Sequence, residues 1–264
     1  MRITRLGRGL FAMAAACIAI LSLTYSDFAP MWHSVPAWVA GREIWVCGTA
    51  IALLIASAGL CIARAALPSA LAIGAYYALW AVASAPPILA EPLNGASWYG
   101  VCEAATSLAG AWILYDTLRW QLRKAEMPIA AQRAVRAAQI LFGLTCVYYG
   151  WSHFAYADYT ASLVPSWLPE RLWFARLTGL GHIGAGIGIM FGILPRLAAT
   201  LEAIMMNLFG LLVWLPSLFV QPRPKWAGTP ENQWSELIVS ILLGACAWVV
   251  ADSLSNRPWG LHES

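Results

Sequence analysis

The stretch from Trp98 to Leu118 reads WYGVCEAATSLAGAWILYDTL, and it has a counterpart later in the chain. The stretch from Trp234 to Leu254 reads WSELIVSILLGACAWVVADSL, and the two share Trp, Trp, Asp and Leu at the same offsets. Each is a largely apolar run that is long enough for a helix to cross a bilayer. The pair therefore predicts two membrane-spanning helices that repeat one pattern.

The composition of the whole chain also indicates a bilayer. Of 264 residues, 60% are hydrophobic and 11% are charged, and the mean hydropathy is +0.65. Soluble domains average about 45–50% apolar and about 25% charged residues. We expect an all-α integral membrane protein with about eight transmembrane helices. The apolar runs lie at residues 8–25, 43–63, 67–90, 98–118, 134–152, 172–194, 197–220 and 233–252.

A second matched pair of stretches extends the repeat. APPILAEP at residues 85–92 matches LPSLFVQP at residues 215–222, with prolines at corresponding places. Each half then contains four helices, and an even number of spans gives both halves the same orientation. We predict two parallel four-helix repeats, one at residues 1–128 with a basic cytoplasmic linker and one at residues 129–264.

The basic residues predict the orientation, because Lys and Arg favour cytoplasmic loops. With the N-terminus inside, most of them fall on the cytoplasmic side, whereas Arg42, Arg171, Arg223 and Lys225 face outward. The first apolar run follows three arginines and could be a cleaved signal peptide, but its counterpart in the second half favours a retained helix. We expect a multi-pass protein of the bacterial cytoplasmic (inner) membrane with both termini cytoplasmic. Basic residues that serve as topology signals leave no binding stripe for nucleic acid.

Ionisable side chains inside predicted spans mark the candidate site, because each costs roughly 2.5–3.5 kcal/mol near mid-bilayer. His182 lies near the middle of its span, Glu103 and Glu236 lie near the outer ends of theirs, and His153 ends another. We predict His182, Glu103 and Glu236 as catalytic residues, and His153 and His182 as ligand-binding residues. The two glutamates are offset by about one turn in the repeat and could pair. His182 could instead hydrogen-bond a neighbouring helix.

Aromatic and small residues predict the walls of the site. Three tryptophans in or beside outer loops are assigned to ligand binding, around an outward-facing cavity: Trp98, Trp167 and Trp234. An aromatic belt at the membrane surface is the alternative for these residues. Gly179 and Gly186 share a helix face with His182 and would offer a smooth strip to a flat ring.

Other charged and metal-binding patterns are weaker. Arg176 is expected to pair with Glu103 or Glu236, and Glu202 is expected to be solvated near the cytoplasmic face. His153 and His182 could in principle be axial ligands of haem, although the sequence has no C-x-x-C-H motif. No His, Cys or carboxylate cluster has metal-ligand spacing, so no metal is predicted.

The stretch at residues 148–193, YYGWSHFAYADYTASLVPSWLPERLWFARLTGLGHIGAGIGIMFGI, resembles the DoxX-like family of small membrane proteins. The resemblance rests on His-Phe at a helix end, a V-P-x-W-L-P loop, and T-G-x-x-x-x-G-x-G on the next helix. It covers residues 134–252 well and residues 8–118 more faintly, where Asp27 replaces His153, as in a fused DoxX/DoxD-like pair. It implies a membrane subunit that in the best understood member passes electrons from thiosulfate to a quinone.

Three functions remain open from the sequence. The leading hypothesis is a quinone-linked redox subunit, in which His182 bonds a quinone carbonyl and Glu103 or Glu236 relays the proton outward. Electrons would come from a small reductant or a redox partner protein. The alternatives are a non-catalytic transporter and a structural subunit of a larger membrane complex. A homo-oligomer could form through the strip of Gly184, Gly188 and Gly192, and membrane lipid is the expected surrounding.

Overall fold

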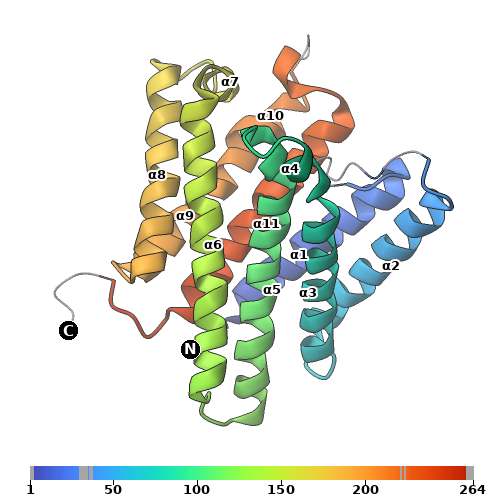
Figure 1. Cartoon of the computed structure of the whole chain (residues 1–264), viewed down its shortest axis with the longest axis vertical. Coiled ribbons are helices and arrows are strands. Elements are labelled where there is room, and N and C mark those ends of the chain that lie inside the picture. Colours follow the sequence, from blue (N-terminus) through green and yellow to red (C-terminus); the bar gives the residue numbers. More distant parts are fainter. Residues whose placement is uncertain (1–2, 30–34, 36–37, 221, 223, 260–264) are drawn as a thin grey trace.

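The computed structural model describes residues 3–29, 35, 38–220, 222 and 224–259. Every regular element in these residues is a helix (Figure 1), which confirms the predicted all-α fold class. Within the described residues, eight long helices lie where the eight spans were predicted. They are α1 (Arg5–Tyr25), α2 (Arg42–Cys61), α3 (Ala66–Ala83), α5 (Tyr99–Arg123), α6 (Ile129–Ala155), α8 (Arg171–Phe191), α9 (Pro195–Phe209) and α11 (Pro230–Ser253).

Short helical elements lie in the connections between the long helices. They are α4 (Pro86–Ala90), η1 (Gly95–Trp98), α7 (Ala157–Leu163), the π-helical turn η2 (Gly210–Trp214), α10 (Leu215–Ser217) and η3 (Lys225–Ala227). The π turn leads directly into Pro216, which has no N–H for the helical hydrogen-bond ladder. The path of the seventh predicted span therefore changes register in its second half, at η2.

Six helical segments of the described chain are long and apolar enough to cross a membrane. They are α1, α2, α3 with α4, α8, α9 with its extension, and α11. The other two long helices, α5 and α6, have sufficient length but are more polar. Most residues of α5 are buried by its neighbours, so this helix needs few side chains that suit lipid. The first turns of α6 carry Arg133 and Arg136.

The long helices of the two halves have matching neighbours. The first-half pairs α1 with α2, α2 with α3, and α3 with α5 correspond to α6 with α8, α8 with α9, and α9 with α11. The two halves then meet through α1 with α11 and α6 with α5, while α5 and α11 pack on each other. This arrangement is what two parallel four-helix units would produce. The division at residue 128 stays a prediction.

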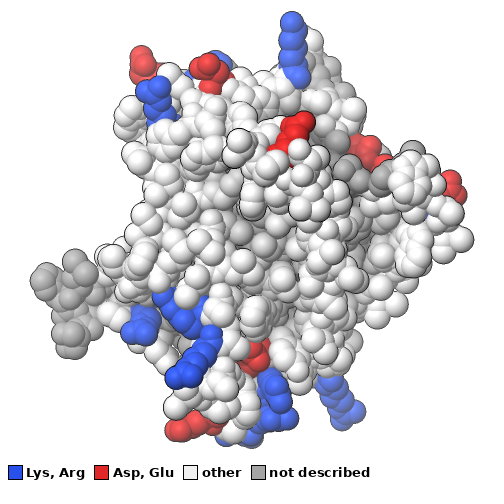
Figure 2. Space-filling view, in the orientation of Figure 1, with Lys and Arg blue, Asp and Glu red and all other residues white. Residues whose placement is uncertain are grey.

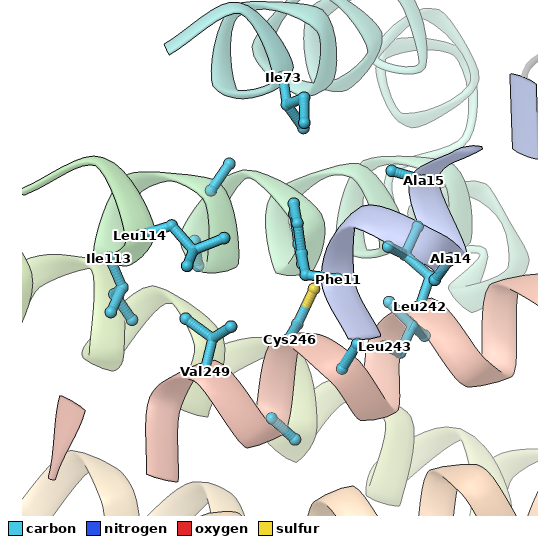
Figure 3. Packing of buried hydrophobic residues seen from close by; sticks show 14 of the residues in the cluster. Phe11, Ala14, Ala15, Ile73, Ile113, Leu114, Leu242, Leu243, Cys246 and Val249 are labelled. Atoms are coloured by element: carbon cyan, nitrogen blue, oxygen red, sulfur yellow. The ribbon is translucent and has the colours of Figure 1, made fainter. Parts of the chain in front are cut away.

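The core lies where α1, α5 and α11 meet. Phe11 of α1 is fully buried beside Cys246 of α11 (Figure 3). Gly110 of α5 faces both, and a Cβ at this position would lie 2.9 Å from the Cys246 sulfur. Glycine is therefore needed for α5 and α11 to approach this closely.

The two ends of the bundle differ in charge. Helix directions place the connection between α5 and α6 at one end together with the start of α1 and the end of α11; we call this the linker end, and the opposite one the α7 end. On the face in Figure 2, Lys and Arg gather at the lower end of the view, and few charges lie at mid-height. The basic residues at or near the linker end are Arg5, Arg8, Arg64, Arg119, Arg123, Lys124, Arg133, Arg136, Arg196 and Arg257. At the α7 end the described ones are Arg42, Arg171, Arg176 and Lys225. The predicted outward residue Arg223 lies outside the described residues.

Candidate functional site

An open cavity of about 570 Å³ lies among α5, α6, α8, α9 and α11, with α7 beside it. Small-molecule sites usually occupy roughly 300–1,000 Å³, so the space suits a ligand of ordinary size. Most of the lining consists of Leu, Val, Met and aromatic side chains, with a few polar groups. The cavity is built mainly from the second half of the chain, and α5 is the contribution of the first half.

The cavity brings together the four ionisable residues that the sequence singled out. His182 from α8, His153 from α6, Glu103 from α5 and Glu236 from α11 all line it. These residues come from four helices that are far apart in the sequence. Their convergence depends on packing that spacing along the chain does not show.

The two histidines are in direct ring contact. Their centroids are 5.1 Å apart with an angle of 78° between the planes, and Phe209 of α9 lies within 6 Å of both. His153 Nδ1 is 3.1 Å from the carbonyl oxygen of Ala175, which can only accept, so this nitrogen carries the proton. In the neutral ring, Nε2 of His153 is then an acceptor.

His182 is bonded to a carboxyl group that the sequence placed elsewhere. Its Nδ1 is 2.8 Å from Oε1 of Glu202 on α9, and the two residues are only 1% and 2% exposed. The expectation that Glu202 is solvated near the membrane surface was therefore wrong. Glu202 shares a buried face of α9 with Ala199, Ala203 and Met206. The helical spacing of these small and apolar residues on either side of Glu202 is the sequence pattern that could have shown that Glu202 is buried.

The alternative reading of His182, a hydrogen bond to a neighbouring helix, also holds. The bond to Glu202 joins α8 to α9 and fixes the ring, and the same residue lines the cavity. A histidine held by a carboxylate at one nitrogen can still act through the other. His182 is thus a structural contact and a cavity residue at once.

Glu103 is buried on the cavity wall, and its Oε2 atom has no hydrogen-bond partner. One turn further along α5, Thr106 accepts or donates a bond with the Tyr149 hydroxyl at 3.0 Å and bonds Thr145 at 2.8 Å. An unsatisfied buried carboxyl oxygen is costly. Such an atom beside a cavity is what a bound polar group would satisfy.

The charged pair expected around Arg176 is not formed. Arg176 is exposed on α8, and the salt bridges of the described residues are Arg42–Asp27 and His182–Glu202. Long arginine side chains reach the membrane surface when they can. Glu103 therefore faces the cavity without an arginine to neutralise it.

The aromatic wall consists of other rings than those predicted. Trp98, Trp167 and Trp234 are all exposed and are absent from the residues that line the cavity. Indole Nε1 of Trp98 donates to the Pro92 carbonyl at 3.1 Å. The rings that line the cavity are Tyr99, Tyr149, Tyr156, Tyr159, Phe174, Phe209 and Trp214. Trp98 in η1, Trp167 in the connection before α8 and Trp234 in the first turns of α11 all face the surface, which fits the alternative of an aromatic belt.

The glycine strip on α8 packs against α6 and is closed to a ligand. A Cβ on Gly150 would lie 2.5 Å from the carbonyl oxygen of Gly179, and one on Gly186 would lie 2.5 Å from that of Gly143. The prediction that a flat ligand ring lies on Gly179 and Gly186 was therefore wrong. These glycines let α6 and α8 approach closely, which positions His153 against His182.

One wall of the cavity also faces outward from the bundle. Leu208 and Leu212, one turn apart on α9 and η2, both line the cavity and are each 43% exposed. Both leucines lie on a segment that is long and apolar enough to cross a membrane. The cavity therefore has an apolar edge that suits contact with lipid.

The corresponding place in the first half is packed with side chains. Asp27, the counterpart of His153, pairs with Arg42. Phe28 and Trp80 meet edge to face at 4.8 Å, with Val46 in the same cluster. The repeated loop continues into residues 30–34 and 36–37, which lie outside the described residues, as do His33 and His262.

The residues at the site can be tested against the groups considered from the sequence. His153 and His182 touch edge to face, which leaves no room for a macrocycle between them, so they do not fit axial ligation of one haem. In the described part of the chain, no group of three His, Cys, Asp or Glu side chains is arranged to hold a metal ion. A quinone fits better, because the wall is apolar and the Glu103 oxygen has no partner.

Comparison with protein families matches part of the chain. Residues 135–220 match the family model described as DoxX. No curated protein and no solved structure matches the chain significantly. The matched residues run from α6 to α10 and include His153, His182 and Glu202, whereas Glu103 and Glu236 lie outside them. The tandem arrangement stays a prediction, since the match lies within the second half of the chain. The chain is therefore a multi-pass membrane protein in which residues 135–220 match the DoxX family.

Proposed function

We propose that the cavity binds the head group of a membrane quinone and that the chain is a quinone-interacting redox subunit of DoxX/DoxD type. One observation carries the proposal. An apolar cavity that borders lipid at Leu208 and Leu212 holds two histidines and two glutamates on its wall. A lipid-soluble ligand with polar oxygens suits such a site better than a hydrophilic one.

His182 is the residue that bonds a ligand oxygen. Its Nδ1 is engaged with Glu202, so Nε2 is the nitrogen left for the cavity. When Nδ1 donates to the carboxylate, Nε2 donates to an oxygen only if the ring is protonated. The pair can hold this proton on the ring, balanced by the Glu202 carboxylate, or on Glu202, which then donates to Nδ1; in both forms Nε2 carries a proton that His182 can deliver to the ligand.

The other polar residues hold and exchange protons. A quinone supplies two-electron, two-proton chemistry when bound, with electrons from a small reductant or a redox partner protein. Glu103 lies five residues into α5 and Glu236 seven residues into α11, both toward the α7 end. They exchange protons between the cavity and that end, which the positive-inside rule makes the outer side. We place the protein in the bacterial inner membrane with both termini cytoplasmic.

The test uses the purified chain in lipid nanodiscs. A short-chain quinone is titrated while tryptophan fluorescence is recorded, and quinol formation is followed by ultraviolet absorbance after thiosulfate is added. We expect saturable binding by the wild type and at least tenfold weaker binding by His182→Ala, since a lost hydrogen bond to a charged group is worth about 1.5–3 kcal/mol. Equal binding by both proteins would contradict the assignment of His182.

Transport is the second candidate, and one feature favours it. The π-helical turn at Gly210–Trp214 and Pro216 lie beside the cavity, and such breaks permit a helix to bend. A substrate would then pass without any redox change. Flux of a tested solute into proteoliposomes, with no quinone binding in the titration above, would replace the redox assignment with this one.

A further inference from the structure

Glu202 has a position unlike that of the other acidic residues at the site. It touches His182 but does not line the cavity, so it lies behind the histidine as seen from the ligand. Counting along α9 from Pro195, Glu202 lies roughly 10 Å above the linker end of the helix. Glu103 and Glu236 lie toward the opposite end.

The chemistry of the pair is that of proton exchange. A 2.8 Å bond between a ring nitrogen and a carboxyl oxygen allows the proton to reside on either partner. The second oxygen of Glu202, Oε2, is buried and accepts no N–H or O–H hydrogen bond; only the Cys146 thiol, a weak donor, lies beside the carboxyl group. A permanently charged, purely structural carboxylate in a membrane interior would be expected to have both oxygens satisfied.

Two polar groups lie on one face of α6 between Glu202 and the linker end, about two turns apart. Cys146 lies beside the Glu202 carboxyl group, and Gln139 lies seven residues before it. Gln139 donates to Ser253 of α11 at 3.0 Å and accepts from Arg136 at 3.2 Å. Arg136 is partly exposed near the linker end. Glu202 thus lies between His182 and the polar side chains near the linker end.

We propose that Glu202 is the proton-transfer residue behind His182, passing one of the two protons that the bound quinone takes up when it is reduced. The proposal rests on the proposed function. In the balanced reaction the quinone accepts two electrons and two protons to become the quinol. Before the step, the proton shared between Nδ1 and Oε1 lies on Glu202, and neutral His182 carries its own proton on Nε2. His182 gives the Nε2 proton to a quinone oxygen while protonated Glu202 gives its proton to Nδ1, and the second proton comes from Glu103 or Glu236. Glu202 therefore changes protonation state during each reduction without touching the ligand.

Redox difference infrared spectroscopy tests the proposal directly. The chain is loaded with a short-chain quinone in lipid nanodiscs, and an electrode with a mediator supplies the electrons. We expect a carboxyl band that changes on quinone reduction, disappears in Glu202→Gln and shifts in Glu202→Asp. Glu103→Gln is the matched control, because it removes a carboxyl group from another wall of the cavity. We expect the Glu202 band to remain in its spectrum. Reduction in Glu202→Gln should slow by about 100-fold, within the range for loss of an acid–base group.

The outcomes separate the two proposals. If wild type and Glu202→Gln bind and reduce quinone alike and the carboxyl band persists in both, Glu202 is only a structural partner and the inference is overturned. If the wild type binds no quinone at all, the proposed function fails and this inference fails with it. Should Glu202→Gln not fold, the Glu202→Asp band decides, because an unshifted band would assign the signal to another carboxyl group.

Discussion

His153 and His182 lie 29 positions apart in the chain, yet their rings meet edge to face with centroids 5.1 Å apart. The contact exists because α6 and α8 approach each other across glycines, with the Gly179 backbone against the base of His153. The close packing of α6 on α8 therefore also sets the arrangement of the two histidines in the site. Changing the glycines should disturb both.

The glycine contacts predict a clear stability difference. Gly150→Ala should destabilise the protein by about 1–3 kcal/mol, because its new methyl group meets the Gly179 carbonyl oxygen at 2.5 Å. Gly184→Ala is the matched control on α8, since nothing lies within 4 Å of the added atom. Thermal unfolding in one detergent measures both. A Gly150→Ala midpoint equal to that of Gly184→Ala would show that α6 and α8 are not packed in this way.

Replacement of Glu103 by an apolar residue should stabilise the protein and impair its function. Its unpartnered oxygen carries a desolvation cost, so Glu103→Met should raise the free energy of unfolding by about 1–3 kcal/mol while it lowers quinol formation. Unfolding midpoints and turnover are compared in the same preparation. Thr106→Val, which removes the bonds to Thr145 and Tyr149, should instead lower stability. A less stable Glu103→Met protein would mean that the carboxyl group has a partner.

The lipid border predicts where the ligand enters. Leu212→Trp should narrow the opening of the cavity beside η2 and slow quinone association. We expect a roughly tenfold lower association rate constant, which is within the range of association rates among variants of one binding site. Leu201→Trp is the control, because Leu201 is exposed on α9 but does not line the cavity. Stopped-flow quenching of tryptophan fluorescence gives the rates relative to variants with the same added ring. Equal rates in the two variants would place the entrance elsewhere.

The corrected aromatic wall can be tested by fluorescence. A bound quinone should quench Trp214, which lines the cavity, far more than Trp167, which is exposed in a loop. Trp214→Phe should therefore remove much of the quenching amplitude, and Trp167→Phe should leave it nearly unchanged. A large loss of quenching amplitude in Trp167→Phe would show that Trp167 lies near the bound quinone, as the sequence analysis predicted.

The sequence predicted the helices well because length and hydropathy determine which segments cross a bilayer. It also identified the four ionisable residues that line the cavity, since such residues are rare in membrane spans and need a reason. The role of Glu202 was missed because its exposure to solvent was inferred from its distance, along the chain, from the end of its predicted span. Its environment is set by which face of α9 packs on α8, and that is a tertiary property.

The tryptophans and glycines were misassigned for a related physical reason. Aromatic residues beside a predicted cavity can point into it or into the membrane surface, and the loop geometry decides between these outcomes. Gly179 and Gly186 share a helix face with His182. A glycine face can pack against a neighbouring helix as well as against a ligand ring, and here it packs against α6. Neither choice can be made from spacing alone.

The most direct test of a quinone site is chemical analysis of what the protein carries. The wild-type chain and His182→Ala are purified in lipid nanodiscs, and extracted small molecules are quantified by mass spectrometry. Gly184→Ala is included as a variant that leaves the cavity intact. The account predicts quinone in near-stoichiometric amount with the wild type and Gly184→Ala, and its loss from His182→Ala. Phospholipid alone in all three preparations would contradict the account.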